Sequence, residues 1–400
     1  MTEKCFRGSF ACIRALWLVF LVASPAVFAQ TDKPAAGDIS PPKALYEFVA
    51  PRKIFDFIRV LNEAGKRGFK LAKVTAVPSG SAESSDEKAY ETVLAAIARF
   101  DGESRYEYDF FFAEENLPPD VKLNDLSQRG WRFREIVSVA GTGDSNAIVD
   151  FPTAGNLYLL ERVVGDEKPS YPYKLLKAGV RLGKNPTEKM QGLLNQATAE
   201  GFVPLASYFT LDIKSLFSVD AFNGVVVGKI PEARKTEYKF VRGNRSDGLR
   251  KEIETFAAQG WRIGAINFNS GIMTREAGPT APLSYQWIET DDKKYAATLA
   301  AALAKNPTFV AAGVDLARDG NYIKNLLIFE NAAGSSEYQF AKMQPVIPKQ
   351  FKKNPQDYLK TLENPDLAFQ RLLTESYFPR DVFYSSVEGL TVIFERQKKK

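Results

Sequence analysis

The chain of 400 residues contains no histidine, and its only two cysteines, Cys5 and Cys12, lie near the N-terminus. Without histidine, Ser-His-Asp triads and imidazole acid–base catalysis are excluded. Beyond residue 12 the chain can form no disulfide and has neither a cysteine nucleophile nor the ligands of a Cys/His zinc site. Most common hydrolase mechanisms are therefore excluded, and the fold must be stabilised by burial of apolar side chains.

The rest of the composition is typical of a soluble globular protein, with 45% apolar and 25% charged residues. The length indicates more than one domain. The formal charge of +5 is small for this length and does not suggest nucleic-acid binding. Neither a Gly-rich phosphate loop nor a Gly-x-Ser-x-Gly elbow occurs. We therefore predict no catalytic residue, no cofactor, no metal ion and no nucleic-acid partner.

The N-terminal segment has the features of a secretory signal peptide. Lys4, Arg7 and Arg14 precede an apolar run over residues 15–23, and small residues precede Gln30. The run is short for a membrane anchor, which needs about 20 residues. We predict that residues 1–29 are removed and that residues 30–43 form a flexible linker. The mature protein is then exported to the periplasm or the extracellular space and does not span a membrane.

An internal repeat dominates the remaining sequence. Leu-Asn, five further residues, Gly and then Phe or Trp occur at Leu61-Asn62 with Gly68-Phe69, Leu123-Asn124 with Gly130-Trp131, and Leu194-Asn195 with Gly201-Phe202. A weaker copy is Ile253-Glu254 with Gly260-Trp261. Such periodicity is typical of a tandem array of small units.

The second copy shows the order of elements most clearly. Residues 106–112 alternate and are rich in aromatics, as in a strand. Pro118 and Pro119 open a helix that ends before Gly130, and residues 131–139 and 156–162 predict two further strands. Each unit is thus a βαββ motif.

We predict an α+β fold of six such units, each with one helix packed on a mainly antiparallel three-stranded sheet. A single unit has a small core, so neighbouring units are expected to pair, two by two with joined sheets. In the last two copies, Thr308 and Tyr377 are expected at the position of the Gly. The predicted units span residues 44–104, 105–168, 169–233, 234–280, 281–333 and 334–400, the last with a basic tail.

The units resemble a small bacterial domain family of unknown function, the 4177 type. The resemblance lies in Tyr106-Glu107-Tyr108, Leu123-Asn124, Gly130-Trp131 and Leu159-Leu160-Glu161-Arg162, and it fades in the last third of the chain. It implies the βαββ fold and brings no activity with it.

The repeated motif of Leu-Asn, Gly and an aromatic residue is best explained by its structural role. Gly ends the helix with a positive φ at low cost, and the aromatic residue packs between helix and sheet. Asn62, Asn124 and Asn195 lie inside helices, where Asn is unfavourable. We expect their amides to bond a backbone group of a neighbouring strand or loop; the alternative is a role in ligand binding.

Two sets of residues are candidate binding sites. Tyr106 and Tyr108, and likewise Tyr171 and Tyr173, lie on one face of a strand. They are expected in the core, or alternatively on an open face as platforms for sugars or peptides. The basic stretch with Lys342, Lys349, Lys352 and Lys353 is interpreted as a solvated loop, or alternatively as a site for an acidic partner.

Charged residues also recur at the ends of the predicted final strands, at Glu161-Arg162, Glu330 and Glu395-Arg396. These side chains could pair across neighbouring units, with little gain in stability where they are exposed. No pair of carboxylates stands out as catalytic.

The sequence therefore predicts a non-catalytic binding or scaffolding protein of the bacterial envelope. Envelope proteins, glycans or an anionic surface are possible partners. One alternative is a glycan-acting enzyme that uses paired carboxylates. Another is an envelope assembly or stress factor that binds other exported proteins.

Overall fold

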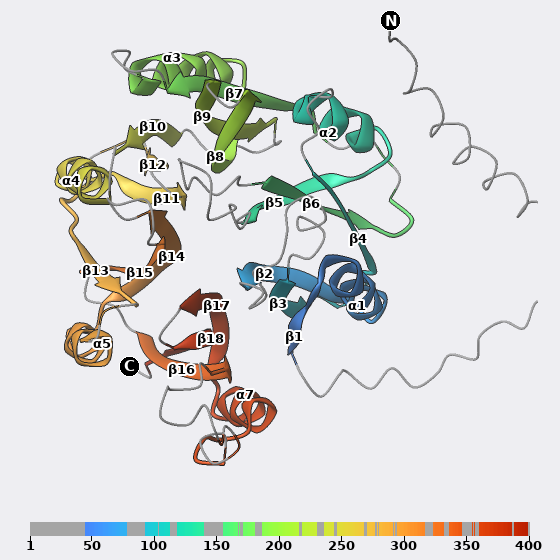
Figure 1. Cartoon of the computed structure of the whole chain (residues 1–400), viewed down its shortest axis with the longest axis vertical. Coiled ribbons are helices and arrows are strands. Elements are labelled where there is room, and N and C mark those ends of the chain that lie inside the picture. Colours follow the sequence, from blue (N-terminus) through green and yellow to red (C-terminus); the bar gives the residue numbers. More distant parts are fainter. Residues whose placement is uncertain are drawn as a thin grey trace, which may run out of the picture. The chain divides into compact units, whose positions relative to one another are not determined.

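The computed structural model shows six βαββ units in the compact part of the chain, Ala44–Lys400 (Figure 1). It describes residues 45–77, 93–102, 104–112, 118–139, 155–166, 168, 171–180, 186–215, 218–229, 236–243, 246–267, 270–276, 278, 280–290, 292, 294–316, 323–331, 336–345, 354, 356, 360–385 and 388–398. The predicted signal peptide and linker lie outside these residues.

The first three units have the elements expected from the repeat. Their bounds are β1 Tyr46–Lys53, α1 Ile54–Lys66, β2 Phe69–Val77 and β3 Val93–Phe100; β4 Tyr106–Phe112, α2 Pro119–Ser127, β5 Arg132–Val139 and β6 Gly155–Val163; β7 Tyr173–Val180, α3 Pro186–Ala199, β8 Val203–Ser215 and β9 Ser218–Gly228.

The last three units repeat this order. Their bounds are β10 Thr236–Arg242, α4 Ser246–Ala257, β11 Arg262–Asn267 and β12 Ser270–Glu276; β13 Tyr285–Glu289, α5 Tyr295–Leu303, β14 Thr308–Leu316 and β15 Ile323–Glu330; β16 Ser336–Gln344, α7 Pro365–Thr374, β17 Phe378–Ser385 and β18 Gly389–Gln397.

Each unit forms its own antiparallel sheet with its third strand in the middle, in the orders β1-β3-β2, β4-β6-β5, β7-β9-β8, β10-β12-β11, β13-β15-β14 and β16-β18-β17. The prediction of an α+β fold made of tandem βαββ units is confirmed. The three strands of every sheet fall within one predicted repeat.

The central strands are buried on both faces. In β3, Leu94 and Ala96 pack with α1 in one core, whereas Ala95 and Ile97 pack with residues of the sixth unit in another. Successive residues of a strand point to opposite faces, so one face of the sheet covers its own helix and the other meets the preceding unit. The sheets therefore pack face to face through the intervening helices. The expectation that sheets join two by two is not met, because every described sheet has three strands.

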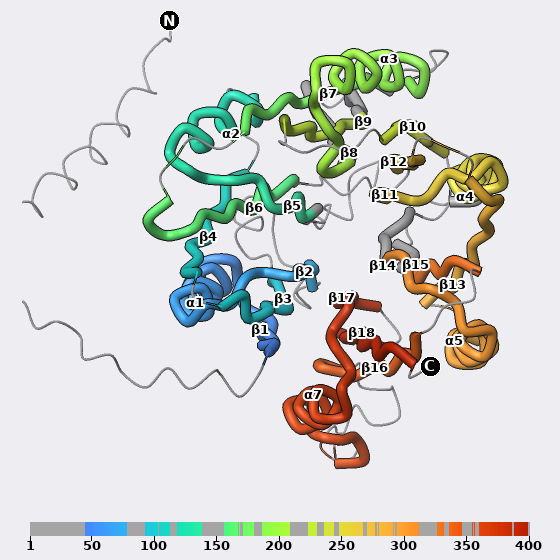
Figure 2. Tube along the Cα trace, turned by 180° about the vertical axis from the view of Figure 1, so that it is seen from behind, coloured from blue at the N-terminus to red at the C-terminus, as the bar shows by residue number. Residues whose placement is uncertain are grey.

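The packing between units closes on itself. Consecutive units share a core at each junction, and the sixth unit shares one with the first. The tilted ring pairs Tyr46–Phe378 and Phe48–Phe369 belong to this last contact, with centroids 5.9 and 6.1 Å apart. Both views show β17 next to β2 (Figures 1 and 2). Because each core is built by two units, we expect the six units to unfold cooperatively.

The helix ends explain the recurring Gly of the repeat and correct the alignment of the last two units. Gly68, Gly130, Gly201 and Gly260 have φ between 81° and 90°. Asn306 and Ser376, with φ of 52° and 65°, occupy this place in units five and six, rather than Thr308 and Tyr377. Both donate their N–H to the carbonyl three residues back, as the glycines do. Asn enters the left-handed region more readily than most residues, whereas the Ser must tolerate some strain.

Candidate functional site

A tyrosine of the first strand stands at the same place in all six units: Tyr46, Tyr108, Tyr173, Tyr238, Tyr285 and Tyr338. At four junctions its hydroxyl accepts a hydrogen bond from a backbone N–H of the preceding unit. The donors are Leu71, Phe133, Ile263 and Phe309, at 2.7, 3.0, 3.1 and 2.9 Å. Each donor directly precedes a β-bulge in the second strand of its unit. The tyrosine thus connects two units at a position that the bulge leaves outside the regular ladder.

A helix amide makes a second link at the first three junctions. Asn62 donates to the carbonyl of Tyr108 at 3.1 Å and accepts from its N–H at 2.7 Å. Asn124 contacts Tyr173 in the same way, at 2.9 and 2.8 Å. The expected bond to a neighbouring strand is therefore present for both, and the strand belongs to the following unit.

The third junction uses a different amide. Gln191 donates to the carbonyl of Tyr238 at 3.1 Å and accepts from the N–H of Phe240 at 2.8 Å. Asn195 is exposed, and its carbonyl accepts from Gln191 at 2.7 Å. The expectation for Asn195 is thus corrected: it lies one turn further along α3, and Gln191 makes the contact with the next unit.

Two junctions lack the tyrosine link because the residue before the bulge is proline. Pro204 in the third unit and Pro379 in the sixth occupy the position of Leu71, and proline has no N–H to donate. Between the sixth unit and the first, the ring of Phe378 lies against Tyr46. Between the third and fourth units, Val203 stands at the aligned position, and a pocket lies there.

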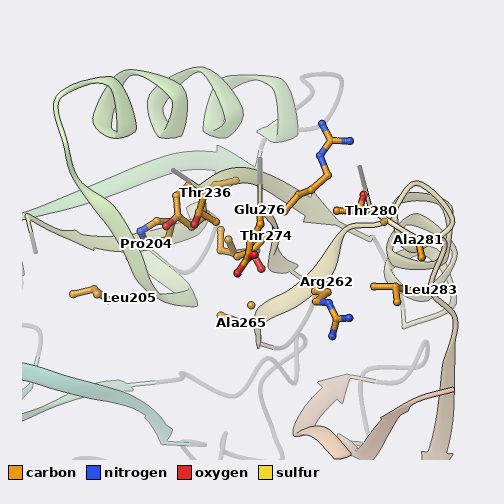
Figure 3. A pocket seen from close by; sticks show the side chains of 15 residues that line it. Pro204, Leu205, Thr236, Arg262, Ala265, Thr274, Glu276, Thr280, Ala281 and Leu283 are labelled. Carbon is orange, nitrogen blue, oxygen red and sulfur yellow. The ribbon is translucent and has the colours of Figure 1, made fainter. Parts of the chain in front are cut away.

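The pocket between units three and four has a volume of about 800 Å³. Pro204 and Leu205 of β8 line one side, and residues of β10, β11 and β12 line the other. Thr236, Thr274 and Glu276 lie close together in it (Figure 3). Its size is within the range of small-molecule sites in proteins, roughly 300–1,000 Å³.

The hydroxyl groups of the pocket are open to a ligand. No hydrogen bond joins the hydroxyls of Thr236, Tyr238 and Thr274 to another residue in the described part of the chain. Tyr238, Thr236 and Thr274 are half-buried, and Ile272 beside them is buried. Hydroxyls that are partly withdrawn from water and lack a protein partner are suited to bind a polar ligand.

The cations of the pocket, in contrast, are already paired. Arg275 binds Glu237 at 2.5 Å and lies over the ring of Trp261. Arg262 binds the buried carboxylate of Glu330 in the fifth unit at 3.0 Å. Its guanidinium extends away from Thr274 (Figure 3).

A second polar cluster joins units one, two and six. Glu135 follows the bulge of β5, and Lys73 and Asp381 follow the equivalent bulges of β2 and β17. Burial raises the pKa of Glu135 to about 7; nearby Lys73 and Arg134 lower it, and the negative charge of Asp381 raises it further. A carboxyl group with this pKa is protonated in part of the molecules at neutral pH.

Replacing Glu135 by Gln is expected to change the pH dependence of stability. The folded-state pKa is above that of an unfolded carboxyl group, so the contribution of Glu135 to stability is fully present below about pH 4.5 and is lost as the pH rises through 7. Gln mimics the protonated form at every pH. We compare the unfolding free energy of Glu135→Gln with that of the wild type at pH 5 and at pH 8. Because Glu135 is half-buried, we expect this difference to shift by about 2 kcal/mol in favour of Glu135→Gln as the pH rises from 5 to 8. Urea unfolding at both pH values measures this difference, and parallel profiles for the two proteins would contradict it.

The residues predicted from the sequence lie in different environments. Tyr106 and Tyr108 are 2% exposed and Tyr173 is 4% exposed, so their rings are in the cores between units and present no open face to a ligand. Tyr171 is half-buried and precedes β7. Lys342 is exposed and forms an ion pair with Glu388, whereas Lys349, Lys352 and Lys353 lie outside the described residues.

Two of the strand-end carboxylates pair across units, as their positions suggested. Glu161 lies 3.5 Å from Lys70 of the first unit, and Glu330 binds Arg262 of the fourth. Glu395 instead lies 3.6 Å from Arg380 of its own unit and accepts from the hydroxyl of Ser336.

The pocket residues were not among the sequence candidates, although one signal for them is present. Aligning the repeats at the Gly places Pro204 where the first, second, fourth and fifth units have a residue with an N–H. A proline beside a bulge marks a junction that differs from the others.

Comparison with protein-family models, curated proteins and solved structures finds no match to this chain. The resemblance to the 4177-type family stays a prediction. Within the described ranges no helix is long and apolar enough to cross a membrane. In the same ranges no group of three or more acidic side chains is placed to hold a metal ion.

Proposed function

We propose that this chain is an exported, non-catalytic binding protein of the bacterial envelope, whose ligand lies in the pocket between units three and four. One observation carries the proposal. At four junctions a tyrosine hydroxyl is bonded to the preceding unit, whereas at this junction Pro204 removes the donor and Tyr238, Thr236 and Thr274 line a pocket. Export is supported by the sequence of residues 1–29.

The pocket can be filled with a side chain that the repeat itself uses. Thr236 stands where the second unit has the buried Tyr106. A Thr236→Tyr variant is therefore expected to occupy the pocket while keeping the strand. The exported chain, purified from a bacterial periplasm, would be incubated with envelope extract, and the retained components would be identified by mass spectrometry.

We expect the wild type to retain a component that Thr236→Tyr loses. A Lys342→Glu/Lys349→Glu/Lys352→Glu variant tests the basic stretch, and it should retain that component. Equal recovery by Thr236→Tyr and the wild type would contradict binding in the pocket. Loss of recovery only in the lysine variant would transfer the site to the basic stretch.

The carboxylate-enzyme alternative is favoured by one feature, the pKa of about 7 at Glu135 beside Asp381. A general acid of a glycosidase has such a raised pKa. Hydrolysis of envelope glycans by the wild type, abolished in Glu135→Gln and unaffected in Thr236→Tyr, would replace the binding proposal with this one.

A further inference from the structure

The geometry points to a neutral saccharide as the ligand of the pocket between units three and four, an inference that rests on the proposed binding function. Three properties of the lining lead to it: the charge balance, the hydroxyl groups and the apolar surface beside them.

The charge balance disfavours an anionic ligand. The lining contains Arg262, Arg275 and Glu276, and the two arginines are bonded to Glu330 and Glu237. Counting these carboxylates, two positive charges face three negative ones. A phosphate or carboxylate ligand would have to displace a carboxylate from an arginine, at the cost of leaving that group unpaired. A cationic ligand would meet Glu276 at the exposed rim, where an ion pair contributes little.

The hydroxyl groups favour a ligand that both donates and accepts. Each of Thr236, Tyr238 and Thr274 can do either, since a hydroxyl has one donor and two acceptor sites. Thr236 and Tyr238 alternate along β10 on one face, and Thr274 faces Tyr238 across the ladder to β12. The three groups form a compact set on one surface, and the many hydroxyls of a sugar ring match such a set.

The third property is an apolar surface next to these hydroxyls. Leu205, Ile272 and the half-buried ring of Tyr238 adjoin them in the pocket. A sugar ring has C–H groups on its faces and hydroxyls at its edge, so it can contact an aromatic or aliphatic surface while its edge is hydrogen-bonded.

The test is isothermal titration calorimetry of the intact exported chain with defined probes: neutral oligomers of glucose and of N-acetylglucosamine, an acidic oligogalacturonate, and an uncharged tetrapeptide. We expect binding of at least one neutral oligosaccharide and a weaker or absent response to the other two. Thr236→Val/Thr274→Val removes two hydroxyls with nearly the same shape on strands that favour Val. It should weaken binding about tenfold or more, a loss of about 1.4 kcal/mol or more, because two hydrogen bonds to the ligand are removed.

Thr255→Val is the matched control. Thr255 lies on the exposed face of α4, and its hydroxyl bonds the carbonyl of Lys251, away from the pocket lining. This variant should bind as the wild type does, and circular dichroism checks that both variants fold. Equal affinity of Thr236→Val/Thr274→Val and the wild type would overturn the assignment of these hydroxyls.

The two proposals fail separately. If no neutral oligosaccharide binds, but Thr236→Tyr still abolishes retention of an envelope component, the saccharide assignment is overturned and the binding function stands. Tighter binding of the oligogalacturonate or the tetrapeptide likewise overturns the assignment alone. If Thr236→Tyr changes neither the titrations nor the retention, both proposals are overturned.

Discussion

An Asn62→Ala variant is expected to lose about 3 kcal/mol of unfolding free energy. The amide of Asn62 forms two bonds to the backbone of Tyr108, whose side chain is buried, at the junction of the first two units. Removing the amide leaves one N–H and one carbonyl without a partner in a place from which water is largely excluded, and each such group costs about 1–3 kcal/mol. The gain in helix propensity from Asn to Ala, at most about 0.7 kcal/mol, offsets only a small part of this loss.

Asn195→Ala provides the matched control. Asn195 has the same place in the repeated motif, but it is exposed, and its side-chain oxygen accepts from Gln191 of its own helix. We expect its replacement to change stability by no more than about 0.5 kcal/mol. Denaturant unfolding of both variants measures the difference. Equal losses would show that the bonds of Asn62 to the second unit do not add to the unfolding free energy.

The division into six units could be predicted from the sequence because it depends on local chemistry. Alternating aromatics indicate strands, and Gly68 or Gly130 at a helix end requires a positive φ that few other residues accept cheaply. In the last two units Asn306 and Ser376 hold that position. The backbone keeps its positive φ there, but no glycine marks the helix end in the sequence. The alignment of the last two units was misplaced for this reason.

The contacts between units could be predicted only in part. The sequence shows that Asn62 needs a hydrogen-bond partner, but it does not show that the partner is 46 residues away in the next unit. Likewise, alternation places Tyr106 and Tyr108 on one face of a strand without showing that this face is covered by α1. These contacts depend on how whole sheets pack against each other. Neither the periodicity of apolar residues nor secondary-structure propensity encodes that packing.

The pocket was missed for a related reason. Its lining comes from five separate segments, and no single residue among them is chemically unusual. What distinguishes this junction from the four linked ones is the loss of a contact, since Pro204 cannot donate to Tyr238. Where the sixth unit meets the first, Phe378 lies beside Tyr46 instead, whereas the aligned residue here is Val203, which has no aromatic ring. A missing contact can be recognised only after the contact has been seen at the other junctions.

Close approach between units leads to the other large effect: Gly65→Ala is expected to destabilise the protein by about 3 kcal/mol. Gly65 lies in α1, three residues after Asn62 and so on the same side of the helix. A Cβ atom at this position would be 2.2 Å from the carbonyl oxygen of Tyr106 in β4. Because the obstacle is backbone, the helix and the next unit would have to move apart. That movement would strain the amide bonds of Asn62 and open the shared core.

Gly192→Ala is the control with the opposite expected sign. Gly192 lies within α3, and an added Cβ would meet no atom within 4 Å. Ala is favoured over Gly in a helix by roughly 1 kcal/mol, so this variant should be more stable than the wild type by up to that amount. Thermal and urea unfolding would be compared for the two variants. Stabilisation by both would mean that α1 and β4 are not in backbone contact, whereas opposite signs would show that the first two units are held together at a distance that only glycine permits.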